Sequence, residues 1–591
     1  MHLVPKQVKG HEYWYLVKTA RRGKRVVTTR TVYIGNRKKL SELLQASTSA
    51  ALPASYEGQE IGASLALTQV ARDLEVEHLV DEACPVRDGA APVGRQLLIA
   101  ALQRALLPRR ANGKRNLRAF YRRSALVELL PMNDAALDGR RVCETLSRLT
   151  AKQVEAIESK VVQRLIAQEG VVLDALAFDT TNFDSYVAAG TASKLLRRGH
   201  GKSGKPLRAL GLGLLVTADD GIPLLTFTYP GNENDVTAFG RFLKALGRRR
   251  ESLELPVDAT VAADGGNISK ALLKRLDAMP LQYVMRLPVG HVSSLARKAS
   301  AELPALKGRL KDKVWAAKLT CEVYGVPRCV VDMYSQRMHR RQLPGLLRDR
   351  KKARADLARL QGLLERQRQG LRRAKPITVA SLKRRVAVAL AREHMDELFQ
   401  AQVEKGDRAP VLRFTESEEA WQHLQEYVLG RTLLVTSRAK WTVQKIVLAS
   451  RCQSHNERFF RDAKDSDGVS MLPLRHRRDP ALRGNALVVV LALLLARVLQ
   501  RRLRVAGVHV GGPADLLAVL RGVQRAKMEL KPDAPNALRA FAATTWVPSK
   551  RSARQQAVLE ALGLAKRPEL GTTVPDMGIR ARHGSASKKD P

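Results

Sequence analysis

Two aspartates and one glutamate stand in sequence settings that suit metal-dependent chemistry on phosphodiesters. Asp179 follows an apolar run in "LDALAFDTTNF", and Asp264 follows another in "DATVAADGGN". A strand that buries its apolar residues presents an aspartate at its end to solvent. Carboxylate oxygens are ligands that Mg²⁺ prefers, and two such ions can activate a nucleophile and stabilise a leaving oxygen at a phosphate. For either aspartate alone, capping of a turn is the more common role.

The third acid, Glu457, lies in a segment with helical spacing, "WTVQKIVLASRCQSHNERFFRDAKD". At about 100° per residue, a continuous helix places Ser450, Gln453, Glu457, Arg461 and Lys464 in one row. One acid followed by two bases would suit a surface that binds a metal ion and an adjacent phosphate. The alternative is a solvated helix on which Glu457 and Arg461 form an i,i+4 ion pair, which contributes only a few tenths of a kcal/mol.

The charge of the chain indicates its partner. The 591 residues carry a formal net charge of +45, and the hydrophobic fraction of 45% is that of a folded protein. This charge repels itself unless a polyanion neutralises it, so nucleic acid is the first partner to consider and an anionic membrane surface the second. The basic residues are spread through folded-looking sequence, which favours a large nucleic-acid footprint.

Cysteines, the N-terminus and the apolar runs suggest a cytoplasmic protein without membrane spans. The five cysteines are scattered and form no C-x-x-C pair, which argues against a zinc site or a disulfide framework. The N-terminus has no signal-peptide pattern. The longest apolar run, 486–496, is too short to cross a bilayer and predicts a fully buried helix.

Apolar periodicity predicts the elements that position the acids. Strand-like runs at 171–183, 207–232 and 258–267, with the helical "DVTAFGRFLKALGRR" before the third, indicate an α/β unit. Residues 10–35 predict a β-hairpin with a basic tip, and helical spacing dominates from about 40 to 165. Beyond the β-like segment 313–335, residues 350–373 predict a long amphipathic helix. From 337 to 375 there are 14 Lys/Arg against 3 Asp/Glu, which favours DNA contact over a merely solvated face.

These segments resemble bacterial insertion-sequence transposases of the DDE group. "HNERFFRDAK" is similar to the Glu-x6-Lys part of that group's Tyr-x2-Arg-x3-Glu-x6-Lys signature. "FDTTNF" and "ADGGNIS" are similar to the segments that carry the first and second acids, and 199–235 resembles the stretch between them. "LPLRHRRDPALRGNALVVVLALLLARVL" is similar to the buried helix after the glutamate. The resemblance covers roughly residues 170–505, with a long insertion between the second acid and the glutamate.

The resemblance implies an α/β catalytic core with a ribonuclease-H-like mixed sheet flanked by helices, a long insertion and additional helical regions. The chain then has six parts: 1–40, a β-hairpin region; 41–168, a helical region expected to bind DNA; 169–290, the first part of the core; 291–429, an insertion with a β segment and long basic helices; 430–505, the second part of the core, with the glutamate helix; and 506–591, a C-terminal helical region and disordered tail.

It also implies the activity and the role of each acid. Asp179, Asp264 and Glu457 would hold two Mg²⁺ ions, with Mn²⁺ able to substitute. Water would cleave DNA at the terminal inverted repeats of the element, and the freed 3′-OH would attack target DNA. A homodimer is expected in the synaptic complex. The protein would be cytoplasmic, associated with the nucleoid when bound to DNA, and would have no membrane partner.

Residues expected to bind DNA include Lys464, which matches the signature, and Arg461. His200 and Lys202, in the "GHGKSGK" loop, could touch phosphates, and a solvated loop is an equally good interpretation. The sequence departs from the signature at Ser450 and Gln453, where the family has Tyr and Arg. Two alternatives therefore stay open: a catalytically decayed DNA-binding protein, and a ribonuclease-H-like nuclease that cuts without joining.

Overall fold

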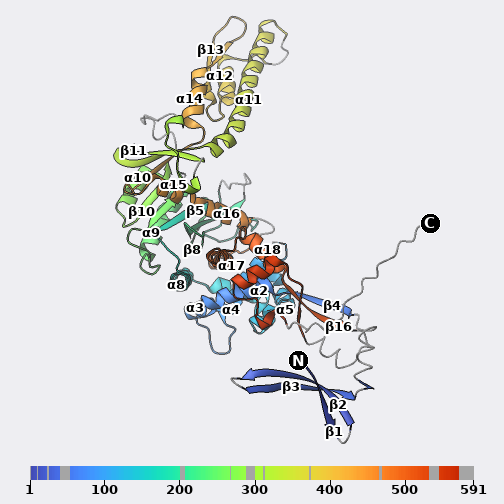
Figure 1. Ribbon diagram of the computed structural model, residues 1–591. Helices are drawn as coiled ribbons and strands as arrows, with labels where there is room; N and C mark the ends of the chain where they lie inside the picture. The colour runs from blue at the N-terminus through green and yellow to red at the C-terminus, as the bar shows by residue number, and fades with distance from the viewer. Residues whose placement is uncertain are drawn as a thin grey trace, which may run out of the picture. The chain divides into compact units, whose positions relative to one another are not determined.

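In the computed structural model (Figure 1), the chain forms two compact units. The first unit comprises Met1–Ile157, Asp462–Pro473 and Pro480–Pro591. The second comprises Glu158–Arg461 and Leu474–Asp479. The structure describes residues 2–8, 11–22, 25–36, 38–39, 53–108, 110–188, 190–199, 207–265, 268–287, 300–310, 313–371, 375–464, 469–530 and 545–571.

The first unit contains two small antiparallel sheets and a set of helices. The strands β1 (His2–Val8), β2 (His11–Arg22) and β3 (Arg25–Asn36) form one sheet, and β17 (Val547–Pro548), β16 (Gln524–Leu530) and β4 (Pro53–Glu60) form the other. The helices are α2 (Gly62–Asp73), α3 (Val76–Ala83), α4 (Val93–Leu106), α5 (Leu117–Arg123), α6 (Leu126–Leu129), α7 (Gly139–Arg148), α17 (Asp479–Val505), α18 (Pro513–Arg521) and α20 (Ala553–Ala561).

The predicted pairing of β2 with β3 is present, whereas β4 occupies a stretch expected to be helical. Its partner β16 lies more than 460 residues away, so no local periodicity marks it as a strand.

Helix α17 is the buried helix that the apolar run predicted. Among the described residues it is the one helix whose length and apolar character would allow it to cross a bilayer. Ninety-four per cent of its most apolar window is buried inside the protein, as in the central helix of a folded core. Gly484 permits this burial, because a Cβ there would lie 2.9 Å from side-chain atoms of Leu146 and Leu149.

A nine-stranded mixed sheet forms the centre of the second unit, which confirms the expected α/β core. In spatial order the strands are β11 (Val314–Val323), β12 (Val326–Ser335), β15 (Arg431–Thr436), β10 (Gln282–Leu287), β9 (Thr260–Ala263), β5 (Ala175–Ser185), β7 (Arg208–Thr217) and β6 (Arg197–Arg198), with β8 (Pro223–Pro230) paired to β7. Strands β5, β9 and β10 are parallel; β7 pairs antiparallel with β5, and β8 pairs antiparallel with β7. The sheet therefore has a ribonuclease-H-like half, which β15, β12 and β11 extend.

Two glycines of β7 make room for large side chains on this sheet. A Cβ on Gly211 would lie 2.3 Å from the ring of Tyr229, and one on Gly213 would lie 2.8 Å from that of Phe178. Phe178 stacks on Phe242 of α9 (Asp235–Arg249), with ring centroids 3.8 Å apart. The alternating glycines of "LGLGLL" thus allow α9 and β8 to pack closely around the strand that carries Asp179.

The helical segment around Glu457 is broken, which corrects the expectation of one continuous helix. The structure has α15 (Val443–Arg451) and α16 (Gln453–Lys464), joined by a turn at Cys452. The amide of Cys452 donates to Ala449, and the Cys452 carbonyl accepts from His455, so both bonds close tighter turns than an α-helix. Ser450 and Glu457 therefore lie on different helices, and the predicted row does not extend across the turn.

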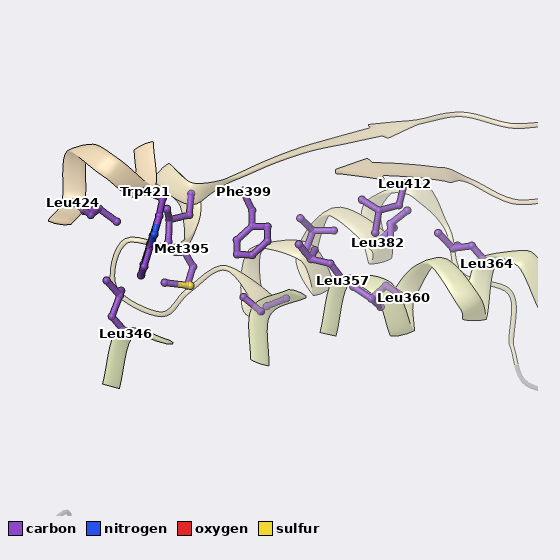
Figure 2. Close-up of a cluster of buried hydrophobic side chains, with 14 of the residues drawn as sticks. Leu346, Leu357, Leu360, Leu364, Leu382, Met395, Phe399, Leu412, Trp421 and Leu424 are labelled. Carbon is purple, nitrogen blue, oxygen red and sulfur yellow. The ribbon is translucent and has the colours of Figure 1, made fainter. Parts of the chain in front are cut away.

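The insertion has a hydrophobic core of its own (Figure 2). It contains α11 (Gln336–Arg368), α12 (Val379–Ala389), α13 (Met395–Leu398), β13 (Phe399–Glu404), β14 (Val411–Glu416) and α14 (Glu418–His423). Leucines of α11 pack with Leu382, Phe399, Leu412 and Trp421 in one cluster. The long basic helix expected at 350–373 is therefore α11, which begins earlier and ends before the exposed Leu371. The six-part division itself stays a prediction.

Candidate functional site

Strand pairing brings the two candidate aspartates side by side. Strands β5 and β9 are parallel, and their paired positions end with Phe178 opposite Ala263. The next residues are Asp179, within β5, and Asp264, just after β9, so the two acids occupy neighbouring positions where the pairing of these strands ends. Parallel strands lie roughly 4.8 Å apart, and residues in register point to the same face. The order of the strands thus joins two carboxylates that are 85 positions apart in the sequence.

Asp179 is held by its neighbours on β5. Its Oδ1 accepts a hydrogen bond of 2.7 Å from the amide of Thr180. The buried Thr180 hydroxyl donates to Asp235, in the first turn of α9, over 2.9 Å. Burial raises the pKa of the Tyr229 phenol, on β8, above its ordinary value, so this phenol stays neutral. The bond between Thr180 and Asp235 joins α9 to the strand position next to Asp179.

Asp264 is more exposed and has a cation nearby. Its side chain is 51% exposed, and its Oδ1 accepts from the Gly265 amide. Arg286 of β10 follows the position that pairs with Ala263 and places its guanidinium 3.8 Å from Asp264. Three consecutive strands thus present Asp179, Asp264 and Arg286 in one row. An exposed pair at this distance is weak, so Arg286 can move when a stronger cation binds the carboxylate.

A buried asparagine joins the glutamate helix to the strand of the first aspartate. Asn456 is fully buried, and its Nδ2 donates a hydrogen bond of 3.1 Å to the carbonyl of Ala177. Ala177 lies on β5 two residues before Asp179. Glu457 directly follows Asn456 and is exposed. The bond therefore fixes the backbone at Glu457 close to the part of β5 that leads to Asp179.

The turn before α16 rests on the connection between β7 and β8. A Cβ on Gly221, which has a positive φ of 64°, would lie 2.7 Å from the ring of His455. Burial, and next the negative charge of Asp219, raise the pKa of the Cys452 thiol to about 12. This thiol is therefore protonated and inert at neutral pH. Both contacts fix the start of α16 and so limit where Glu457 can lie.

The structure does not bring the three acids into a closed metal site. In the described part of the chain, no group of three or more His, Cys, Asp and Glu residues could hold an ion together. Asp179 and Asp264 are adjacent, and Glu457 lies on the helix tied to β5, so the assignment of all three as ligands stays a prediction. The donor set itself fits Mg²⁺, since each member supplies carboxylate oxygens and two members stand in register.

The structure describes two of the four residues expected to bind phosphate, Arg461 and Lys464. Arg461 is exposed one turn after Glu457, and no ion pair joins these two described residues. Lys464 ends α16 and is half-buried; it belongs to the first unit, whereas the three acids belong to the second. His200 and Lys202 lie outside the described residues.

Two further arginines lie near the glutamate helix. Arg451 ends α15, and Arg337 lies in the first turn of α11. Partial desolvation, and next the positive charge of Arg337, lower the pKa of Arg451 from its ordinary value. Like charges at close range favour binding of an anion between or beside them.

Sequence reasoning missed Asn456, Arg286 and Arg451. One of them had a signal: Asn456 shares a stripe with Phe459, Phe460 and Ala463, all buried and at i, i+3, i+4 and i+7 spacing. A polar residue within such an apolar stripe needs a hydrogen-bond partner. The roles of Arg286 and Arg451 depend on strand pairing and on the start of the insertion, neither of which local patterns reveal.

Comparison with known proteins places this site in a family. The sequence model of the family described as "Transposase DDE domain" matches residues 169–495, more than half of the chain. A search of curated proteins found no match. Among solved structures, the chain is similar to one titled "Cryo-EM structure of piggyBac transposase synaptic complex with hairpin DNA (SNHP)", at 9% identity and a TM-score of 0.34, over 79% of this chain and 82% of that one. At that score the likeness supports no inference about this chain. The family match spans β5, β9 and α16, the elements that carry all three acids, and the chain therefore belongs to the family of transposases with a DDE domain.

Proposed function

We propose that this transposase cleaves DNA at the terminal inverted repeats of a bacterial insertion sequence and joins the freed 3′ ends to target DNA. The observation that carries the proposal is the placement of Asp179 and Asp264 in adjacent register positions on parallel strands, with the helix of Glu457 tied to the same strand. The family match over the same elements supports it.

Asp179, Asp264 and Glu457 would hold two Mg²⁺ ions, or Mn²⁺ in their place. Bound there, the ions would supply activation of the attacking oxygen and charge stabilisation at the departing 3′ oxygen. Asp179 and Asp264 provide adjacent carboxylates, and Glu457 provides the third from α16. Without a cation three carboxylates repel one another, so closure of Glu457 on the aspartates is expected when metal neutralises them.

Cations of this chain would hold the DNA. Arg461, exposed one turn beyond Glu457, is suited to contact a phosphate close to the acids. We assign Lys464 the same kind of contact because it matches the family signature, and we include His200 and Lys202 because the basic side chains of their loop could touch backbone phosphates. The partners would be duplex DNA at the element ends, target DNA and a second copy of the chain in the synaptic complex. We place the protein in the cytoplasm, bound to the nucleoid.

The test begins with the DNA that flanks the reading frame, where short inverted repeats bordered by direct duplications are expected. Duplexes that carry those repeats are then incubated with the wild-type protein and with Glu457→Gln, in Mg²⁺ or Mn²⁺. The wild type should produce both nicked ends and joined products on a sequencing gel. Glu457→Gln should bind the repeats with nearly wild-type affinity and cleave none of them, because the amide keeps the shape and removes the charge.

Two outcomes would support other functions. Cleavage without any joined product would indicate a ribonuclease-H-like nuclease. Binding of the repeats without cleavage by the wild type, in either metal, would indicate a catalytically decayed DNA-binding protein. Equal loss of binding and cleavage in Glu457→Gln would mean that Glu457 has a structural role.

A further inference from the structure

The outer face of α11 carries a row of four arginines and one lysine. At about 100° per residue, Arg341, Arg348, Lys352, Arg359 and Arg366 fall within about 40° of one another around the helix axis. The buried residues of α11 lie on the opposite side and are Leu346, Ala353, Leu357, Leu360 and Leu364. Figure 2 shows the leucines of this helix directed into the core of the insertion. The row, called the α11 stripe below, therefore faces away from that core.

Most members of the stripe have no acidic partner. Arg341, Arg348, Lys352 and Arg366 are exposed and form no ion pair with any acid in the described ranges of the chain. Arg359 has a bond of 3.4 Å to Asp356 of the same helix. Stripe cations thus keep nearly their full charge for an external anion.

Other arginines of α11 are paired. Arg350 and Arg354 bind Glu416, and Arg350 also stacks on Trp421, 4.1 Å from the ring centroid. Arg368 pairs with Glu365 over 2.6 Å. These three lie nearer the core side of the helix. Arginines paired with acids thus lie nearer the core side, whereas four of the five stripe cations have no acidic partner among the described residues, and an ordinary solvated face would mix both signs.

Helix α11 leaves the sheet in the direction in which β5 and β9 run. Strand β12 pairs antiparallel with β15, which pairs antiparallel with β10, so β12 runs in the same direction as β5 and β9. Helix α11 follows β12 directly and therefore leaves the sheet from the end toward which β5 and β9 run. Its first turn carries Arg337, whose charge acts on Arg451 of the helix pair that leads to Glu457. Arg337 and Arg451 thus add positive charge near the start of α11.

We propose that the α11 stripe binds the phosphate backbone of duplex DNA that extends outward from the candidate active site. This inference rests on the proposed function for the identity of the DNA and deepens it by naming a second, extended contact. From Arg341 to Arg366 the helix rises about 38 Å at 1.5 Å per residue. That length corresponds to roughly 11 base pairs at 3.4 Å each. Single charges spaced along a rigid helix suit a regular backbone and carry no base specificity.

Matched double variants test the stripe. Arg341→Gln with Arg348→Gln removes two stripe cations, whereas Arg354→Gln with Arg368→Gln removes two paired cations from the same helix. Both change the net charge by the same amount, so a long-range field effect would be equal in the two proteins. The binding constant for a duplex is measured against salt concentration, where each phosphate contact contributes a slope of about 0.9. The stripe variant should lower the slope by about 1.8, which weakens binding by about 60-fold at 0.1 M salt relative to 1 M salt, and the control should change the slope by less than about 0.5.

Duplex length supplies the second readout. Shortening the duplex by about 11 base pairs on the side that α11 follows should weaken binding by the wild type, and should weaken binding by the stripe variant less, because that variant keeps only three of the five stripe cations. Equal slopes in the two variants, or no coupling between length and variant on either side of the cut, would overturn the proposal. Equal competition by single-stranded RNA of the same length would replace it with a general polyanion surface. All of these readouts measure binding alone, so they stand even if the wild type fails to cleave DNA and the proposed function is wrong.

Discussion

Replacing Asn456 with alanine should show whether this residue positions Glu457 for metal binding or only stabilises the core. The side chain is fully buried and donates to the Ala177 carbonyl over 3.1 Å. A net hydrogen bond contributes about 0.5–1.5 kcal/mol, and truncation also removes packing. Because Asn456 Oδ1 has no partner in the structure, no second bond is lost. The free energy of unfolding should therefore fall by about 1–2 kcal/mol.

A larger effect is expected on metal binding. Without the bond to β5, the first turns of α16 can shift, and Glu457 moves with them. Loss of a residue that orients a metal ligand typically costs 10–100-fold in metal affinity or activity. We therefore expect the Mn²⁺ dissociation constant of Asn456→Ala to rise by about that factor. Electron paramagnetic resonance of free Mn²⁺, in the absence of DNA, measures it without relying on catalysis.

The control is Ser454→Ala, which removes a polar group from the same turn of α16 and leaves the bond between Asn456 and Ala177 intact. It should match the wild type within twofold in Mn²⁺ affinity. If Asn456→Ala loses 1–2 kcal/mol in urea unfolding but binds Mn²⁺ as the wild type does, Asn456 is only a core residue. If it loses no stability, the hydrogen bond does not contribute as the geometry indicates.

Two other predictions concern buried charges. Arg431 and Asp332 form an ion pair over 2.9 Å with side chains 1% and 2% exposed, so Arg431→Met should cost about 3–5 kcal/mol in urea unfolding, and adding Asp332→Leu should restore most of it. Burial raises the pKa of Glu60 from 4.5 to about 7, so the folded state holds this proton while the unfolded state has lost it, and stability falls as pH rises between those values. Glu60→Gln, which still accepts from Ser64, should flatten the stability profile across that window; an unchanged profile would contradict the assignment.

The sequence predicted most of the sheet that holds the aspartates, because the physical signal was local. The apolar runs that precede Asp179 and Asp264 are strands in the structure, although β5 continues past Asp179 to Ser185, and the helix expected at 235–249 has those bounds. The register that joins the two acids depends on parallel pairing of distant strands. Local periodicity cannot show it, and only the family resemblance indicated it.

The turn at Cys452 escaped prediction for a similar reason. The segment has no Gly or Pro, and its helical spacing is uninterrupted, so the local pattern favours one helix. Contacts with the β7–β8 connection, at His455 and near Asp219, accompany the bend. Tertiary packing thus overrode a continuous local preference.

The bend places on different helices the two positions at which this chain departs from the family signature, Ser450 and Gln453. Ser450 stands on α15 and donates back to the Val447 carbonyl over 2.8 Å, so its hydroxyl is engaged within its own helix. Gln453 is the first residue of α16, beyond the turn. The family signature has an arginine where this chain has Gln453. Two other arginines supply positive charge near this position: Arg451 lies two residues away, and Arg337 is close enough to Arg451 to lower its pKa. Loss of the signature arginine therefore does not remove positive charge from this region.

If Arg451→Gln weakens binding of a DNA end while Gln453→Arg restores it in the same chain, the two positions share one role. If Gln453→Arg brings no recovery, Arg451 has a separate role and the departure from the signature stands as a real loss.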